Sequence, residues 1–223
     1  HLSLGYSHPN FSLRFLSFYT FSEQEYRDLE GEIGLGSQHN RYTTEGFGAN
    51  SLIKIYAEDK GMISLFAEGR RETYKPEDLI SESKEEESLR DSTSLALGGE
   101  IYLIDARIVV APSIRFERHK SDFGGRPATL ATLPAEGEER TDTFESPRLG
   151  VSIRPWEFLY FKGNAGRYYR VPTFPELFGD RGFIVGNPDL LPEEGINYDA
   201  GLGIEKKKFF YLDRIYGEYA AFL

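Results

Sequence analysis

Apolar and polar residues alternate along much of this chain with a period of two. Clear runs have mostly apolar side chains at every second position, and they fall at 47–55, 63–67, 95–101, 108–116, 149–153 and 196–204. Successive side chains of a β-strand point to opposite faces, so these runs predict strands with one apolar and one polar face. We interpret 11–21 and 29–35 in the same way, although Leu16 and Phe18 interrupt the first run. With 158–170 and 209–222, the pattern predicts about ten strands.

The connections between the predicted strands alternate in length. Short links fall at 58–61, 103–105, 155–157 and 206–208, whereas long polar links fall at 76–88, 120–141 and 171–194. Short turns at one end and long loops at the other are typical of an outer-membrane barrel, and a β-sandwich distributes its loops less regularly. We therefore predict an all-β fold, an antiparallel up-and-down transmembrane β-barrel, with its polar face lining a wet lumen and its apolar face meeting lipid.

Composition agrees with a β protein but leaves two environments open. The chain has 17 Phe, 14 Tyr and one Trp, together 14% of its residues, and aromatic side chains suit both strands and the interfacial girdles of barrels. Mean hydropathy is −0.45, and no stretch approaches the roughly 18 apolar residues that a spanning helix needs. On composition alone, a soluble all-β binding or structural protein remains an alternative.

Charge and side-chain chemistry exclude several function classes. Net charge is −10, from 26 basic and 36 acidic residues, which argues against nucleic acid as a partner. No cysteine is present, so we expect neither disulfides nor thiolate chemistry. The sequence has no Gly-x-Ser-x-Gly elbow and no phosphate-binding loop, so we expect no enzyme and no cofactor. The four histidines are scattered, and the acidic run at 76–88 is interpreted as a solvated loop rather than a metal site.

The densest group of motifs lies at 145–203. In order, the chain has Ser-Pro-Arg-Leu-Gly at 146–150, Pro-x-Glu at 155–157, Gly-x-x-x-Arg-x-Pro-Thr-x-x-Glu-Leu-Phe at 166–178 and Gly-Asn-Pro-Asp-Leu-x-Pro-Glu at 186–193. This ordered set resembles the C-terminal part of the β-barrel in TonB-dependent outer-membrane receptors. Residues 1–144 are compatible with that resemblance and do not add motifs to it.

The resemblance implies a fragment of a larger barrel of about 22 strands. Residues 1–223 would be a partial barrel domain, and the N-terminal plug that fills such a barrel would be absent from this chain. The start at His1-Leu2, without Met or a leader segment, also leads us to expect an excerpt of a longer protein.

The implied function is uptake of a scarce nutrient, such as an iron–siderophore complex, cobalamin or another metal complex, across the bacterial outer membrane. Implied partners are that small-molecule ligand, the TonB energy-transducing complex acting through the plug, and outer-membrane lipid and lipopolysaccharide. A passive porin-like channel remains the alternative within the barrel class, because such a channel has the same strand pattern without a plug.

Most of the motif at 166–193 is interpreted as loop architecture. Proline fixes φ, and a carboxylate can accept hydrogen bonds from loop amides or pair with Arg170 or Arg181. The residues assigned to this role are Pro172, Glu176, Asn187, Pro188, Asp189 and Glu193.

Three residues near the outer end of the preceding strand are the candidates for ligand contact: Arg167, Tyr169 and Arg170. Arginine and tyrosine suit anionic or aromatic ligands, although an interfacial girdle that contacts lipopolysaccharide is an equal alternative. The polar phase of the strands also predicts lumen-facing charges, which would pair with a plug or set the field of a channel: Arg107, Arg115, Glu117, Arg154 and Lys162.

Overall fold

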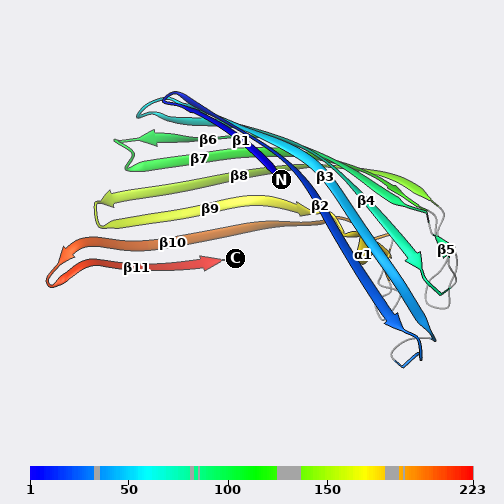
Figure 1. Ribbon diagram of the computed structural model, residues 1–223. Coiled ribbons are helices and arrows are strands. Elements are labelled where there is room, and N and C mark those ends of the chain that lie inside the picture. Colours follow the sequence, from blue (N-terminus) through cyan, green and yellow to red (C-terminus); the bar gives the residue numbers. More distant parts are fainter. Residues whose placement is uncertain are drawn as a thin grey trace.

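The computed structural model describes residues 1–32, 36–80, 83–84, 86–124, 137–178, 186–187 and 189–222. These residues form one curved antiparallel sheet in the order β1-β2-β3-β4-β6-β7-β8-β9-β10-β11, with β5 paired to β4 off this path (Figure 1). The strands are β1 (Leu2–His8), β2 (Phe11–Asp28), β3 (Gln38–Tyr56), β4 (Gly61–Asp78), β5 (Ser83–Lys84), β6 (Ser88–Leu103), β7 (Ile108–Phe123), β8 (Glu138–Trp156), β9 (Leu159–Arg170), β10 (Glu193–Phe209) and β11 (Leu212–Phe222). A short helix, α1 (Phe174–Phe178), lies between β9 and β10.

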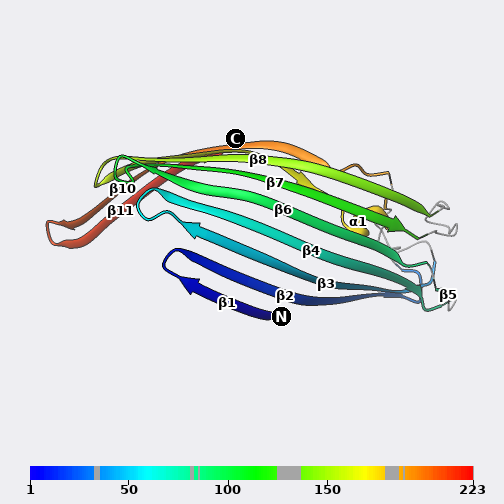
Figure 2. The same cartoon turned by 90° about the horizontal axis from the view of Figure 1, so that it is seen from above.

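The ten strands of the main path run up and down in chain order, which confirms the predicted all-β meander. Short turns at 9–10, 57–60, 104–107, 157–158 and 210–211 lie at one end, and the long connections lie at the other (Figure 1). The sheet is not closed, because β1 and β11 each pair on one side within the described residues (Figure 2). Among these residues, no helix is long and apolar enough to cross a membrane.

The predicted strand at 29–35 is wrong for its described part, and 33–35 lie outside the described residues. Strand β2 ends at Asp28, whose carboxylate accepts a hydrogen bond from the backbone N–H of Glu32 at 3.0 Å. Gly31 has a φ of 69°, and Ser37 donates to the carbonyl oxygen of Leu29 at 2.7 Å. These local bonds make a turn of a segment whose alternation suggested a strand.

Strands extend further into the predicted long loops than the polarity of those loops suggested. Strand β4 continues through Glu77 to Asp78, β7 reaches Phe123, and β8 begins at Glu138. Cross-strand charge pairs accompany this extension, since Lys120 lies 3.2 Å from Glu139 and Arg41 lies 3.9 Å from Glu77. Charged residues continue a strand when their partners stand on the neighbouring strand.

The two faces of the sheet differ in chemistry, and the strand register defines them. The outer face carries aliphatic rows such as Ile53–Leu65–Leu97–Ile114, and Leu65 and Leu97 are 50% and 51% exposed. No second layer covers these rows in the described part of the chain, as expected for a face that meets lipid. The inner face carries polar rows such as Asn50–Glu68–Ser94–Glu117.

The buried apolar core lies on the inner face, at the long-loop end. It consists of Tyr42, Tyr74, Phe123, Phe174 and Leu177. Two of these residues come from α1, so the β9–β10 connection folds inward beneath the arch of the sheet (Figure 1). The sequence pattern did not predict this helix, since five residues are too few to show helical periodicity.

Candidate ligand site on the inner face

A hollow of about 700 Å³ lies on the inner face, next to α1. Its lining comes from strands β2, β3, β4, β6, β7, β8 and β9, from Val171 and Thr173, and from the first turn of α1. The residues that line it are Ser22, Thr44, Glu68, Arg70, Glu72, Arg90, Ser92, Ser94, Arg115, Glu117, His119, Phe144, Tyr169, Arg170, Val171, Thr173, Phe174 and Pro175. The hollow therefore combines cations, carboxylates, hydroxyls and aromatic rings.

Arginines and glutamates alternate along the strands that line the hollow. Arg70 pairs with Glu72 on β4, and Arg115 pairs with Glu117 on β7 at 3.0 Å. Arg115 also donates to the hydroxyl of Ser94 on β6 at 2.8 Å. These contacts fix the guanidinium groups in place, and Arg70 Nε and Arg115 Nε are still buried without an acceptor in the described residues. The two side chains are 38% and 39% exposed, so a small rotation brings each guanidinium to an acceptor that enters the hollow.

Arg90 joins strand β6 to the inward-folded connection. The residue is 6% exposed, and its side chain donates from Nε to Ser121 Oγ at 3.1 Å and from Nη1 to the carbonyl oxygen of Pro172 at 2.9 Å. Its guanidinium carbon lies 4.8 Å from the ring centroid of Phe174. A buried guanidinium that keeps charge-assisted hydrogen bonds and a ring contact offsets part of its desolvation cost.

An aromatic wall closes one side of the hollow. The rings of Phe144 and Tyr169 stack with their centroids 4.6 Å apart, and the ring of His119 lies 5.8 Å from that of Phe144. His119 Nδ1 is 2.8 Å from the hydroxyl of Ser92, which fixes the imidazole orientation. Flat rings beside fixed guanidinium groups suit a ligand that has both oxygen acceptors and planar or apolar parts.

Helix α1 begins with one half of a capping box, the bond from the carboxylate to the cap residue. Thr173 precedes the helix, and its backbone N–H and hydroxyl donate to the Glu176 carboxylate at 2.8 and 2.9 Å. The residue three positions after the cap thereby satisfies a backbone donor that the helix leaves unpaired. Phe174 then stacks on Tyr74 with centroids 5.2 Å apart, and Leu177 is almost fully buried.

Arg170 holds the two ends of this connection together. Its guanidinium donates to Glu176, at 2.9 and 3.0 Å, and to Glu193 at the start of β10. Together with Thr173, the Arg170 guanidinium lowers the pKa of Glu176 to about 2. The carboxylate is therefore charged at any pH near neutral, so the clamp on α1 is present under ordinary conditions.

Residues 2–223 match the family model described as TonB dependent receptor-like, beta-barrel. The chain belongs to this family. Its members are receptors and transporters of the bacterial outer membrane rather than enzymes. The resemblance drawn from 145–203 is confirmed, and the match extends it to the N-terminal strands, where no motif had been found.

Solved structures of the same architecture include the copper transporter OprC, with a TM-score of 0.69 and 13% identity over 89% of this chain. The FrpB iron transporter from Neisseria meningitidis gives 0.67 and 15% over 94%. BauA, the ferric preacinetobactin receptor from Acinetobacter baumannii, gives 0.55 and 11% over 90%. At these identities the similarity establishes the fold alone. The receptor chain spans about a third of each structure, namely 33%, 33% and 34%, and no curated protein matches it.

Of the three candidates for ligand contact in this receptor barrel, two line the hollow and one does not. Tyr169 belongs to the aromatic wall, and Arg170 lines the hollow while it holds Glu176 and Glu193. Arg167 instead pairs with Glu194 at 2.9 Å, is exposed, and lies over the ring of Tyr169 at 4.9 Å.

The residues assigned to loop architecture contact one another or a neighbouring strand where the structure describes them. The Asn187 N–H donates to the carbonyl oxygen of Glu176 at 3.0 Å, and its side-chain oxygen accepts from the N–H of Asp189 at 3.0 Å. The carbonyl oxygen of Pro172 accepts a hydrogen bond from Arg90 Nη1. Pro188 and Arg181 lie outside the described residues, so their assigned roles stay predictions.

The predicted lumen charges divide between the hollow and the short-turn half of the sheet. Arg115 and Glu117 line the hollow. Lys162 pairs with Glu218, Arg154 lies over the ring of Tyr160 at 5.7 Å, and Arg107 stands in the β6–β7 turn. In the described part of the chain, no group of three or more His, Cys, Asp or Glu residues is arranged to hold a metal ion.

Sequence reasoning missed Arg70, Arg90 and Phe144 as lining residues. All three lie on the polar phase of their strands, so extending the alternation would have put them on the inner face. Their height along the strands depends on the register across neighbouring strands, which no local pattern in one strand contains.

Proposed function

We propose that this chain forms part of the barrel wall of a TonB-dependent transporter that takes up a scarce nutrient across the bacterial outer membrane. The end of the sheet that carries the long connections would face the outside, because outer-membrane barrels have long extracellular loops and short periplasmic turns. A plug domain outside this chain would fill the lumen and receive energy from the TonB complex.

The observation that carries the proposal is the chemistry of the hollow at the long-loop end. Arg70 and Arg115 hold buried donors without acceptors among the described residues, and Phe144 and Tyr169 add flat rings. An incoming ligand would meet this surface before it reaches the periplasmic half of the barrel. We infer a ligand with several oxygen acceptors, such as an iron–siderophore complex. Cobalamin and other metal complexes are further candidates, and the uptake experiment described below compares them.

The solved relatives support this range of ligands. They include a copper transporter, an iron transporter, a ferric preacinetobactin receptor, and a hemophore receptor from Serratia marcescens solved with hemophore and heme. All four names describe cargo that contains a metal or a metal complex. For this chain, metal-complex cargo is the proposal that best fits both that range and the donor-rich hollow.

The direct test is uptake by cells that make the complete receptor as their only transporter of this kind. Labelled ferric siderophores, heme, cobalamin and copper would be supplied in turn, with TonB present and with TonB deleted. We expect one class to accumulate only when TonB is present. Accumulation that is independent of TonB would identify a passive channel and contradict the proposal.

Substitutions at two adjacent arginines test whether the ligand binds in the hollow. Arg70→Gln removes a guanidinium from the hollow, whereas Arg71→Gln removes one from the outer face and is the matched control. A hydrogen bond to a charged group contributes about 1.5–3 kcal/mol, so Arg70→Gln should weaken ligand binding roughly tenfold or more. Equal effects of the two substitutions would show that the ligand does not contact the hollow.

A further inference from the structure

The tip of the β10–β11 hairpin differs from every other short turn of the sheet. Lys206, Lys207 and Lys208 are followed directly by Phe209, Phe210 and Tyr211, without an acidic residue between Glu205 and Asp213. None of the other short turns has an excess of positive charge: Glu58 and Asp59 accompany Lys60 in β3–β4, Asp105 accompanies Arg107 in β6–β7, Glu157 lies in β8–β9, and Pro9-Asn10 in β1–β2 is uncharged. In a chain of net charge −10, this tip is a local concentration of positive charge.

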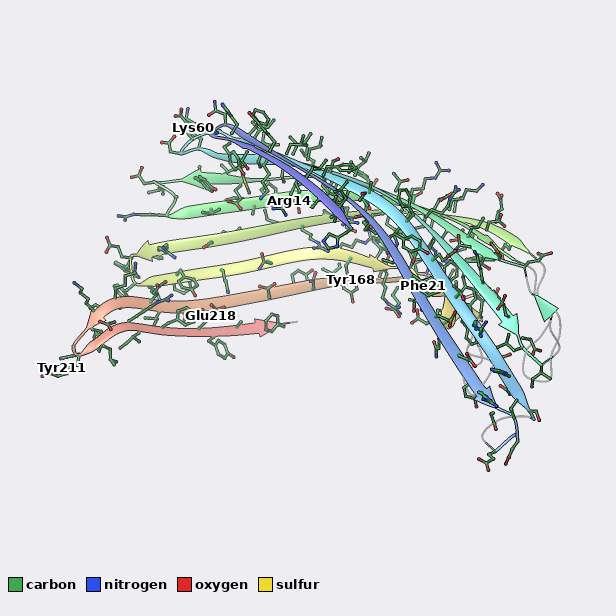
Figure 3. All side chains as sticks on the ribbon, in the orientation of Figure 1. Arg14, Phe21, Lys60, Tyr168, Tyr211 and Glu218 are labelled. Atoms are coloured by element: carbon green, nitrogen blue, oxygen red, sulfur yellow. The ribbon has the colours of Figure 1, made fainter. Side chains whose placement is uncertain are left out.

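The aromatic residues of the tip are presented to the surroundings. Phe210 is 88% exposed and Tyr211 is fully exposed. The hairpin reaches beyond the turns of the other hairpins, with Tyr211 at its extreme end, whereas Lys60 marks the β3–β4 turn (Figures 1 and 3). A further strand paired along the free edge of β11 would leave this turn uncovered, because Phe210 and Tyr211 lie between the paired residues Phe209 and Leu212.

The backbone of the tip is strained at Phe210, which has a φ of 54°, a region in which glycine or asparagine is far less strained than a bulky side chain. Positive φ outside glycine also occurs in the β3–β4 turn, at Glu58, and in the β6–β7 turn, at Ile104, Asp105 and Ala106. Among the described residues, the ring of Phe210 makes its only aromatic contact with neighbouring Phe209, at 4.7 Å.

The position of the lysines fits the polar layer of a bilayer. Ile204 is the last outer-face aliphatic residue of β10, in line with Leu202. Lys206 and Lys208 follow it by two and four residues, which is about 7 and 13 Å along a strand and less along the membrane normal for a tilted strand. The headgroup region of each leaflet is roughly 5–8 Å thick beyond the hydrocarbon, so lysine side chains of this length reach its phosphates.

We propose that the Lys206–Tyr211 tip is a binding site for anionic phospholipid headgroups of the periplasmic leaflet. The lysine ammonium groups contact headgroup phosphates, and the rings of Phe209, Phe210 and Tyr211 insert at the interface where aromatic side chains are favoured. The outer-face aliphatic rows lead continuously from the hydrocarbon to this tip, which is why lipid rather than a soluble periplasmic protein is the partner it fits. The site would anchor one side of the barrel at a fixed depth.

Native mass spectrometry of the complete receptor in detergent tests this proposal. Phosphatidylglycerol and phosphatidylethanolamine are the two probes, and the measured quantity is the ratio of their apparent affinities. One lysine near an anionic surface is worth about a fivefold change in affinity. Replacing Lys206, Lys207 and Lys208 by Gln together should therefore reduce the preference for phosphatidylglycerol by roughly tenfold or more.

Two further variants keep the test decisive. Lys54, Lys60 and Arg107 lie at the same end of the sheet, in or beside two turns that also carry acidic residues, so replacing them by Gln removes equal charge and should leave the preference unchanged. Replacing the three tip lysines by Arg should retain the preference, which separates loss of charge from loss of folding. An unchanged preference in the Lys-to-Gln tip variant, or an equal loss in the control, would overturn the proposal. Binding of a periplasmic protein to the tip without lipid selectivity would overturn it as well.

Discussion

Arg70 and Arg71 are adjacent on β4, but Arg70 lies on the inner face of the sheet and Arg71 lies on the outer face. Arg70 faces inward, lines the hollow and keeps a buried donor without an acceptor in the described residues. Arg71 faces outward and forms a bidentate pair with Asp91 on β6, at 2.7 and 2.8 Å. One residue step along a strand therefore separates a group available to a ligand from a group already satisfied at the surface.

The same comparison holds for the two faces as a whole. The inner face is polar, but its apolar residues are buried around α1, whereas the outer face exposes Ile63, Leu65, Leu95 and Leu97 at 50% or more. In water the outer arrangement would be unfavourable at about 25 cal/mol for each Å² of apolar surface. In a bilayer it is the expected one, because the backbone groups of the strands between β1 and β11 are satisfied by neighbouring strands and lipid covers the aliphatic side chains.

The largest expected effect comes from placing a charge on the outer face. Leu97→Lys should destabilise the complete receptor by about 2–4 kcal/mol if Leu97 lies near the bilayer midplane. Unfolding by urea in lipid vesicles measures this difference. The matched control is Asn50→Lys on the inner face, where the new ammonium would face Glu68, whose carboxylate lies 3.3 Å from the Asn50 amide. Equal destabilisation by the two changes would contradict the assignment of the faces.

The core around α1 gives the next largest effect. Leu177 is 1% exposed, so Leu177→Ala should weaken docking of the β9–β10 connection by about 2–3 kcal/mol. Hydrogen exchange of the backbone amides in α1 would report this loss while the strands stay protected. Leu191→Ala in the same connection is the control, since Leu191 is 75% exposed. Unchanged exchange in the Leu177 variant would show that burial of Leu177 does not stabilise the docking of α1.

Arg90 tests the polar side of the same contact. Arg90→Gln leaves the carbonyl of Pro172 without its charged donor and removes the cation from the ring of Phe174, which should cost about 1–3 kcal/mol of docking free energy. Arg71→Gln, on the outer face of the neighbouring strand, should leave the exchange of α1 unchanged, because an exposed ion pair contributes little. The same amide exchange measures both variants, and a larger effect of Arg71→Gln would reverse the interpretation.

Lowering the pH from about 4.5 toward 2 should release α1 from the sheet. The lowered pKa of Glu176, about 2 against an ordinary value of 4.5, stabilises the docked helix fully above pH 4.5. This contribution is lost as the pH falls from 4.5 toward 2, because the protonated carboxyl no longer holds Arg170 and Thr173. The protection factors of the α1 amides, which compare exchange with the intrinsic rate at the same pH, should therefore fall over that range in the native protein, and Glu176→Gln should remove this pH dependence. A release near pH 6 would point to a different group.

The up-and-down order of strands could be predicted because the alternation of apolar and polar residues lies within each strand. Alternation in 63–67 and 108–116 is local, and short and long connections can be read without knowledge of the neighbours. Alternation gave a wrong prediction where side chains form hydrogen bonds with nearby residues. Asp28 and Ser37 make such bonds, and residues 29–32 form a turn instead of a strand.

The site was predictable only in part, for a physical reason. Tyr169 and Arg170 stand within a recognisable motif, but the acceptor for Arg90 is the carbonyl of Pro172, 82 residues away in the sequence. The docking of Phe174 on Tyr74 likewise depends on how far β9 stands from β4 across the curved sheet. Such contacts arise from sheet register and curvature, which periodicity within one strand does not determine.

The most direct measurement of the central claim is a scan of single cysteines along β4 at Ile63, Ser64, Leu65, Phe66, Ala67 and Glu68. The chain has no cysteine of its own, so spin labels at these positions in the membrane-embedded receptor have no background from this chain. We predict that accessibility to oxygen, which dissolves in lipid, peaks at 63, 65 and 67, and that the even positions are shielded from it. Uniform accessibility, or a period near 3.6 residues, would contradict a strand that separates bilayer from lumen.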